Sequence, residues 1–185
     1  MRKVVASKSF RELWPPIMRL LEKADPKKHV VVFDIDATIL YNVRDGLNDA
    51  TPNFKVQMLY DLARRRKIPV YFVTARIGLP DNRRWTVRQL ANMGFDWYQG
   101  LYMRGAQHRT SEQIAAFKAD ARRQIEQETR KKVILNVGDQ WTDHVIEGSA
   151  QYDQLERNYH GQHVIFSPRD NSHTLVALKL YETQD

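Results

Sequence analysis

The sequence contains no cysteine, and it has no apolar run of the roughly 20 residues that a membrane-spanning helix needs. The absence of cysteine excludes disulfides, a cysteine nucleophile and cysteine-ligated zinc. The residues after Met1 turn polar too soon to form the long apolar core of a secretory signal. We therefore expect a protein without a membrane segment, located in the cytoplasm.

The composition is that of a globular protein. Of 185 residues, 42% are hydrophobic and 28% are charged, which is ordinary for a chain that buries a substantial core. No internal repeat, low-complexity tract or linker interrupts the chain. We expect a single domain over residues 1–185.

Positive charge is in excess, with a net charge of +7 and an isoelectric point near 9.7. Such a chain attracts anionic partners. The basic residues cluster at 64–67, 83–84, 122–123 and 130–132. Most clusters fall on predicted helices, where solvated faces and helix C-termini explain them. A nucleic-acid surface remains possible but is not favoured.

Apolar strand-like runs alternate with amphipathic segments along the chain. This alternation predicts an α/β fold of three layers, Rossmann-like, with a mainly parallel five-stranded sheet. The expected strands are 29–33, 68–73, 100–104, 132–137 and 163–166, and the expected helices are 8–24, 51–67, 81–93, 111–130 and 144–158. Residues 41–51 form a loop that could cover the sheet edge, and the end of the chain could be helical or extended.

Several details of the helices can be predicted. Pro15-Pro16 should make the first helix irregular or divide it into two pieces. Thr51-Pro52 should start the second, with Phe54, Met58, Leu59 and Leu62 on its inner face. Trp85, Val87, Leu90 and Met93 should form the apolar side of the helix 81–93, with Gly94 as its C-cap. Thr110 and Gln113 form a capping box for the helix that follows.

Two aspartates, Asp34 and Asp36, directly follow the apolar run Val30-Val31-Val32-Phe33. Such a run is typical of a central strand in a parallel sheet, whose carboxyl end faces the ligand-binding crevice. Two carboxylates one residue apart can hold a divalent metal or act as nucleophile and general acid. They could also simply end the strand and cap the next element.

Two other predicted strands end in similar groups. Thr74 and Arg76 follow the second strand, and Asp139 and Asp143 follow the fourth. Because parallel strands share one carboxyl edge, these groups could converge. Together with a lysine, four carboxylates and a hydroxyl would suit a magnesium-assisted reaction on a phosphate.

Four segments resemble the ordered motifs of the haloacid dehalogenase (HAD) superfamily. They are Phe33-Asp34-Ile35-Asp36-Ala37-Thr38, Val73-Thr74-Ala75-Arg76, Phe117-Lys118-Ala119-Asp120 and Gly138-Asp139-Gln140-Trp141-Thr142-Asp143. The resemblance covers about residues 29–145. The last motif is most similar to the plant acid phosphatase and vegetative storage protein branch.

The resemblance implies a two-step phosphatase mechanism. Asp34 would attack phosphorus to form an aspartyl-phosphate, and Asp36 would act as general acid and then general base. Mg²⁺ would be held by Asp34, Asp139, Asp143 and the backbone carbonyl of Asp36. Thr74, Ala75, Lys118 and Arg76 would bind the phosphate.

Each assignment has an alternative. Thr74 and Asp143 could cap helices, Lys118 could be a surface lysine, and Arg76 and Arg104 could form ion pairs instead of binding substrate. The histidines His108, His144 and His173 lack metal-ligand spacing and are interpreted as ordinary polar residues. Ala37 departs from the family, which often has glycine after the second aspartate.

The implied function is Mg²⁺-dependent hydrolysis of a small or broad-range phosphomonoester, without a large cap domain. Only about 30 residues separate Leu40 from Val70, too few for a lid with its own core. The alternatives are a polynucleotide 3′-phosphatase and a non-catalytic basic nucleic-acid-binding module of the same fold. A response-regulator receiver fits poorly, because its acidic pair, phosphoacceptor and lysine come in a different order.

Overall fold

The computed structural model describes residues 8–41, 50–143, 162–167 and 174–178. The helices are α1 (Phe10–Lys23), α2 (Phe54–Arg65), α3 (Pro80–Asn92), α4 (Ser111–Thr129) and the short 3₁₀ helix η1 (Trp141–Asp143). The strands are β1 (Lys8–Ser9), β2 (His29–Phe33), β3 (Leu40–Tyr41), β4 (Thr51–Pro52), β5 (Val70–Ile77), β6 (Gly100–Arg104), β7 (Lys132–Gly138), β8 (Gln162–Ser167) and β9 (Thr174–Leu178). None of the described helices is long and apolar enough to cross a membrane.

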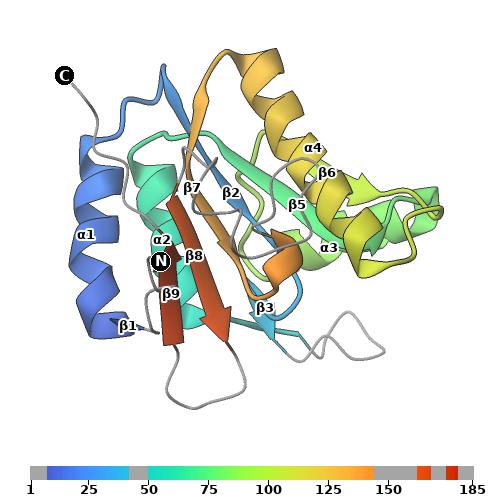
Figure 1. Cartoon of the computed structure of the whole chain (residues 1–185), viewed down its shortest axis with the longest axis horizontal. Helices are drawn as coiled ribbons and strands as arrows, with labels where there is room; N and C mark the ends of the chain where they lie inside the picture. Colours follow the sequence, from blue (N-terminus) through green and yellow to red (C-terminus); the bar gives the residue numbers. More distant parts are fainter. Residues whose placement is uncertain (1–7, 42–49, 144–161, 168–173, 179–185) are drawn as a thin grey trace, which may run out of the picture.

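Seven strands form the main sheet, in the order β1-β9-β8-β7-β2-β5-β6 (Figure 1). The five predicted strands are all present, and they run parallel as β8, β7, β2, β5 and β6. The expected count of five is wrong, because β9 pairs antiparallel with β8 and β1 pairs antiparallel with β9. The C-terminal segment thus contributes an extended strand, one of the two forms that the sequence allowed.

The central strand β2 is buried on both faces, which explains its continuous apolar run. Val31 and Phe33 pack in a cluster with residues of α1, α2 and α3, such as Leu21, Leu59 and Leu90. Val30 and Val32 pack on the other side with Ala121 and Ile125 of α4. The predicted three layers are therefore confirmed, with α4 on one face of the sheet and the other three long helices on the opposite face.

Helix α1 is not divided at its prolines. It is one helix with Pro15 and Pro16 inside it, although each proline removes a backbone hydrogen bond. Ile17 and Leu21 follow on one face and are fully buried against the core. This packing holds the second half of the helix in line, so the prediction of two pieces is wrong.

The predicted inner faces of α2 and α3 are partly wrong. Phe54 is 70% exposed and Met58 and Val87 are more than a third exposed, whereas Leu59, Leu62 and Leu90 are buried as expected. Helix α2 begins three residues after Thr51, because the Asn53 side chain accepts a hydrogen bond from the backbone N–H of Lys55. Thr51 and Pro52 instead form β4, which pairs antiparallel with β3.

The ends of α3 and α4 lie close to the predicted positions. The C-cap of α3 is Met93 and not Gly94. Gly94 comes next with φ of +83°, a conformation that glycine adopts without cost. Thr110 and Gln113 form both bonds of the capping box at the start of α4. The expected helix at 144–158, the loop 42–49, His144 and His173 lie outside the described residues. Within the described ranges, the β3–β4 pair is the only sheet apart from the main one. The expected lack of a large cap stays a prediction.

Candidate active site

The candidate site lies at the topological switch point of the sheet, where successive strands begin to be added on the opposite side of β2. From β2 the chain continues to β5 and then β6 on one side, and it returns to β7 and then β8 on the other. The loops after β2 and β7 therefore diverge, and a crevice at such a switch point is where ligands bind in open α/β sheets. Asp34 follows β2 and Asp139 follows β7.

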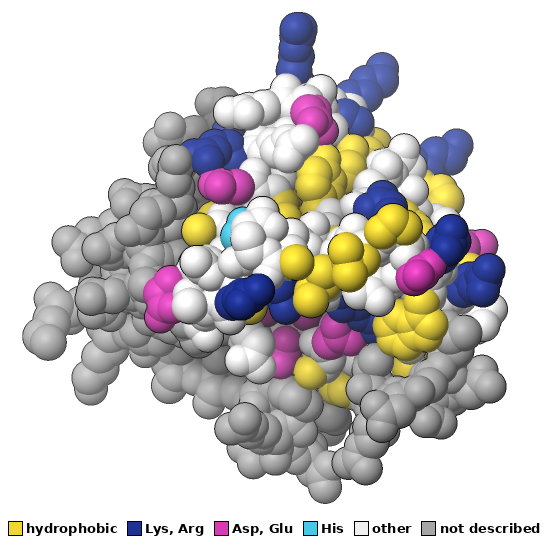
Figure 2. All heavy atoms as spheres, turned by 90° about the vertical axis from the view of Figure 1, so that its right-hand side faces the viewer, with side chains coloured by type: hydrophobic (Ala, Val, Ile, Leu, Met, Phe, Trp, Pro, Cys, Tyr) yellow, Lys and Arg dark blue, Asp and Glu magenta, His cyan; other side chains and the backbone are white. Residues whose placement is uncertain are grey.

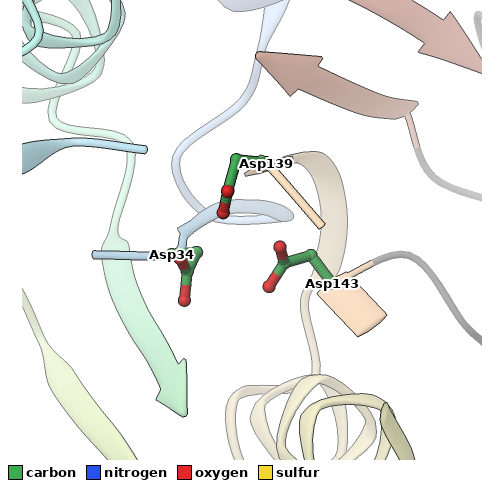
Figure 3. A group of neighbouring side chains, drawn as sticks. All are labelled: Asp34, Asp139 and Asp143. Carbon is green, nitrogen blue, oxygen red and sulfur yellow. The ribbon is translucent and has the colours of Figure 1, made fainter. Parts of the chain in front are cut away.

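Asp34, Asp139 and Asp143 lie together at this edge. One carboxylate oxygen from each lies within 4.8 Å of the others. Figure 3 shows the three side chains around one space, from the loops after β2 and β7 and from η1. Asp34 is only 5% exposed, and its backbone N–H donates to the carbonyl of Val137 in β7 at 2.8 Å. The convergence expected from the sequence is therefore observed for these three acids.

Gly138 permits the close approach of Asp143. A Cβ atom at residue 138 would lie 2.4 Å from both Cβ and Cγ of Asp143. Any larger residue would displace that carboxylate from the cluster, so the glycine is required by space and not by its backbone angles.

Lys118 of α4 joins two of the acids. Its Nζ donates to Asp34 Oδ1 at 2.8 Å and also to Asp143 Oδ1. The side chain is 3% exposed, so the alternative of a surface lysine is wrong. A buried cation between two carboxylates is stabilised only by such pairing.

The backbone and side chain of Asp143 are both held in place. Its carbonyl accepts from Arg122 Nη1 at 2.6 Å and from Asn136 Nδ2 at 2.7 Å. Its Oδ2 accepts from the backbone N–H of Gln140 at 2.9 Å. Asp143 is 2% exposed, and these contacts fix it within the cluster. It therefore does more than cap a helix, which was the alternative considered for it.

Thr38 lies between the carboxylates that follow β2 and β7. Its Oγ1 is 3.4 Å from both Asp34 Oδ2 and Asp139 Oδ1. The carbonyl of Thr38 accepts from Asn53 Nδ2 at 2.9 Å, and Asn53 is also the N-cap of α2. The loop that carries Asp34 and Asp36 is thereby anchored to the start of α2.

Asp36 does not join the cluster of three acids. Its carboxylate accepts three charge-assisted bonds from Arg76, from Nε at 2.9 Å to Oδ2 and 3.2 Å to Oδ1, and from Nη2 at 2.7 Å to Oδ1. Arg76 in turn donates from Nη1 to Thr86 Oγ1 at 3.2 Å, and its guanidinium lies 4.6 Å from the centroid of the Trp85 ring. Asp36 remains 42% exposed in its side chain while Arg76 is 9% exposed, so a fixed arginine orients an accessible carboxylate.

The remaining predicted residues lie at the end of β5. Thr74 is fully buried, and its Oγ1 accepts from the backbone N–H of Arg76 at 3.3 Å. The carbonyl of Ala75 accepts from Arg104 Nε. Arg104 also donates to the carbonyl of His108 at 2.6 Å, so it ties together the end of β5 and the segment after β6. Among the residues that the structure describes, it forms no ion pair, the alternative considered for it.

A family model described as the HAD superfamily, subfamily IIIB (acid phosphatase), matches residues 41–168, which is more than half of the chain. The chain belongs to the HAD superfamily, subfamily IIIB. The resemblance of the motifs to the HAD superfamily is thus confirmed. Asp34 and Asp36 precede the matched region, and the closer likeness to the plant branch stays a prediction.

A solved structure agrees with this fold. The crystal structure of a class C acid phosphatase from Bacillus anthracis with tungstate bound is similar at a TM-score of 0.56 and 15% identity, over 80% of this chain and 67% of that one. A chain of the Pnkp1/Rnl/Hen1 complex is similar at a TM-score of 0.48 and 22% identity, over 63% of this chain. This protein spans only 40% of the length of that second chain. No curated protein sequence matches.

Burial and charge set the electrostatics of this HAD site. Burial raises the pKa of Asp34 well above 3.8, with Lys118 opposing the shift and the other acids adding to it. Burial and then Asp143 raise the pKa of Asp139 from 3.8 to about 6. Burial disfavours the charge of Lys118, but Asp143 and Asp34 outweigh it and raise its pKa. Burial and the neighbouring acids together disfavour the charged form of Asp34 and Asp139, so a further cation at the site would stabilise the two carboxylates.

The donors at the site fit a divalent metal. Three carboxylates within reach of one ion offer hard oxygen ligands, which Mg²⁺ prefers over nitrogen or sulfur. Members of the HAD superfamily generally use a divalent metal, and the acids Asp34, Asp139 and Asp143 could hold one here. The side chain of Asp36 faces Arg76, which leaves only its carbonyl for the metal role assigned to it.

The sequence did not indicate several residues that support this site. Arg122, Asn53, Trp85 and Thr86 carry no recognisable motif, and their contacts depend on the tertiary fold. Asn136 is an exception, because a buried amide within the apolar strand β7 is a signal that could have been noticed. Thr38 belongs to the first motif, yet its position between two acids could not be read from spacing.

Proposed function

We propose that this protein is a Mg²⁺-dependent phosphomonoester hydrolase that acts through an aspartyl-phosphate on a small or broad-range phosphate ester. The observation that carries the proposal is the buried Lys118 between Asp34 and Asp143, with Asp139 beside them, at the switch point of a subfamily IIIB fold. This group unites a nucleophile, a phosphate-binding cation and metal ligands in one place.

Asp34 is the nucleophile in this proposal. One of its oxygens forms a bond to phosphorus as the bond from phosphorus to the ester oxygen breaks, and Asp36 gives its proton to that leaving oxygen. Asp36 then takes a proton from water, whose oxygen attacks phosphorus and releases inorganic phosphate and free Asp34. A bound Mg²⁺ would offset the repulsion between the anionic nucleophile and the anionic ester.

The contacts of Asp36 hold it in place for its proposed role as acid and base. Arg76 fixes the carboxylate through Nε and Nη2 while leaving it accessible, and accessibility is needed for proton exchange with the leaving group and with water. Trp85 and Thr86 hold Arg76 in turn. Arg76 is therefore primarily a positioning residue, and any contact with substrate would come in addition to this role.

The charges favour a small ester over a polynucleotide end. The described site holds four carboxylates and the three cations Lys118, Arg76 and Arg122, so positive charge does not dominate there. The basic clusters at 64–67 and 130–132 lie at the opposite, amino-terminal edge of the sheet. A polynucleotide held by its end would need cations beside the site to contact further phosphates.

The test is hydrolysis of a generic phosphomonoester with and without Mg²⁺ by the wild type and by Asp34→Asn. We expect Mg²⁺-dependent turnover in the wild type and a loss of at least about a thousandfold in the variant, because no other group can form the covalent intermediate. Asp120→Asn is the matched control, since Asp120 is an exposed acid on α4, and it should keep wild-type turnover.

Circular dichroism should show that Asp34→Asn is folded. A folded variant that retains more than a few per cent of the wild-type kcat would remove Asp34 from the nucleophile role. Equal activity with Mg²⁺ and with a chelator would show that the reaction does not need the metal. The specificity constants for a 3′-phosphorylated oligonucleotide and a mononucleotide, compared at low and moderate salt, distinguish the two substrate classes.

A further inference from the structure

Three turns at the amino-terminal edge of the sheet carry the positive charge of the whole chain. They are residues 22–28 before β2, 64–67 before β5 and 130–132 before β7. Together they contain ten basic and two acidic residues, a net charge of +8, whereas the entire chain has +7. The remaining residues therefore sum to −1. We call these three turns the basic edge.

Direct contacts join the turns into one surface. Arg66 donates to the carbonyl of Glu22, and Lys131 Nζ donates to the carbonyl of Pro26 at 2.8 Å. The backbone N–H of Lys132 donates to the carbonyl of Lys28 at 2.7 Å. Nine of the ten basic side chains are exposed. Figure 2 shows Lys and Arg side chains projecting from the top of the molecule, the end at which β2 and β7 begin in Figure 1.

Helix C-termini alone do not explain this distribution. Cations stabilise a helix mainly in its last turn, yet α4 has no basic residue there. Lys27, Lys28 and Lys132 lie beyond the helix ends. Lys67 and Arg130 have φ of +57° and +56°, at positions after helices where glycine is usually favoured. A long cation at such a position costs backbone energy that a glycine would avoid.

We propose that the basic edge binds the phosphate backbone of a nucleic acid. Contiguous exposed cations from separate turns can contact several phosphates at once and release counterions from them. A membrane surface fits less well, because the large apolar side chains exposed in the described part of the chain are Phe54, Met58, Leu79 and Val87. None of these lies in the basic edge, so it lacks an apolar anchor for the lipid interface.

The basic edge is separate from the candidate active site. Strand β2 runs from His29, next to the basic edge, to Phe33, next to Asp34, and five residues of strand span about 17 Å. The binding proposed here is therefore not the binding of a substrate phosphate at Asp34. It holds whether or not the phosphatase activity proposed above is found.

The test measures binding of a fluorescent 20-nucleotide single strand by anisotropy over a range of salt concentrations. The variant Lys28→Gln/Arg65→Gln/Lys132→Gln removes one exposed cation from each turn. We expect its affinity to fall at least about tenfold, and the slope of log K against log salt to fall by about 2, as three lost phosphate contacts predict. The control Arg19→Gln/Arg88→Gln/Arg109→Gln removes the same charge from exposed positions elsewhere and should change affinity less than about threefold.

Three outcomes overturn the proposal. Equal losses in the two variants would mean that only net charge matters, and no measurable binding by the wild type at low salt would exclude the surface altogether. The test also measures binding of the wild type and of both variants to vesicles that contain anionic lipid. Stronger binding to them than to the oligonucleotide, lost in the first variant, would assign the basic edge to membranes instead. Thermal unfolding of both variants shows that each is folded.

Discussion

Ala37 has a backbone conformation that alanine rarely adopts. Its φ is +58°, and the turn around it is fixed, because the carbonyl of Ile35 accepts from the N–H groups of Thr38, Ile39 and Leu40. Glycine often occurs at this point of the motif in HAD proteins. A left-handed alanine costs about 1–2 kcal/mol, so the turn that aims Asp34 and Asp36 is held against a local strain.

Replacing Ala37 by glycine should stabilise the protein. The free energy gained by relieving the strain exceeds the free energy lost because glycine makes the unfolded chain more flexible. The free energy of unfolding should therefore rise by up to about 1 kcal/mol, and Tm by roughly 1–4 °C. Ala116→Gly is the matched control, because Ala116 is exposed within α4, where glycine costs up to about 1 kcal/mol. Thermal unfolding measures both, and a decrease in Tm for Ala37→Gly equal to that of the control would contradict the proposed strain.

At the scale of elements, Asn53 couples helix α2 to the loop that carries Asp34 and Asp36. The side chain caps α2 through Lys55 and donates to the carbonyl of Thr38, and Asn53 is 2% exposed. By contrast, Thr110 caps α4 from an exposed position. The Asn53 side chain therefore holds a neighbouring loop as well as its own helix, whereas the Thr110 side chain bonds only to its own helix in these contacts.

Asn53→Ala should cost more stability than Thr110→Ala. Loss of a cap costs about 1 kcal/mol in each case, and Asn53→Ala also leaves a buried carbonyl without its donor, for a further 1 kcal/mol or more. Urea unfolding should give about 2–3 kcal/mol for Asn53→Ala and about 1 kcal/mol for Thr110→Ala. Only the Asn53 variant should also lower kcat, because Thr38 and Asp34 lie on the loosened loop. Equal losses of stability would show that the bond to Thr38 is unimportant.

These elements also show what could be predicted. The five parallel strands were predictable because burial on both faces leaves a continuous apolar run, and the box at Thr110 because its two partners are three residues apart. The strands β1 and β9 and the start of α2 at Asn53 depend on pairing and bonding across the fold. Helical periodicity predicted that Phe54 and Val87 face the core, but both are exposed. The residues of these helices that pack in the core are Leu59, Leu62 and Leu90.

In the candidate site too, local patterns were predictable and contacts made across the fold were not. Asp34, Asp139 and Asp143 were predictable from strand ends, and Lys118 from the order of the HAD motifs. An ion pair of Arg76 was one of the alternatives, and the structure shows it. Its partner Asp36 was not predicted, because two residues 40 positions apart meet only once β2 and β5 pair. The roles of these residues, the single-domain organisation and the cytoplasmic location stay predictions.

At the scale of the whole molecule, charge is separated between the two edges of the sheet. The amino-terminal edge has the excess of cations, whereas the carboxyl edge gathers acids whose pKa values burial raises, Asp139 to about 6. Between pH 4 and 6 folded Asp139 keeps a proton that the unfolded chain releases. Its contribution therefore favours the folded state fully below about pH 4 and is lost as the pH rises through 6.

Mg²⁺ should reverse this loss, because it binds the deprotonated carboxylates of the folded state only. We expect a rise in Tm of several degrees at pH 7.5 with Mg²⁺ at about 100 times its Kd, equivalent to about 2.7 kcal/mol. At pH 5 the rise should be much smaller, since protons compete for Asp139. Differential scanning calorimetry with and without Mg²⁺ measures both. Asp139→Asn should abolish the rise at pH 7.5, whereas Asp120→Asn, a change at an exposed acid of α4, should preserve it. A rise that is the same at pH 5 and pH 7.5 would show that the ion binds elsewhere than at these acids.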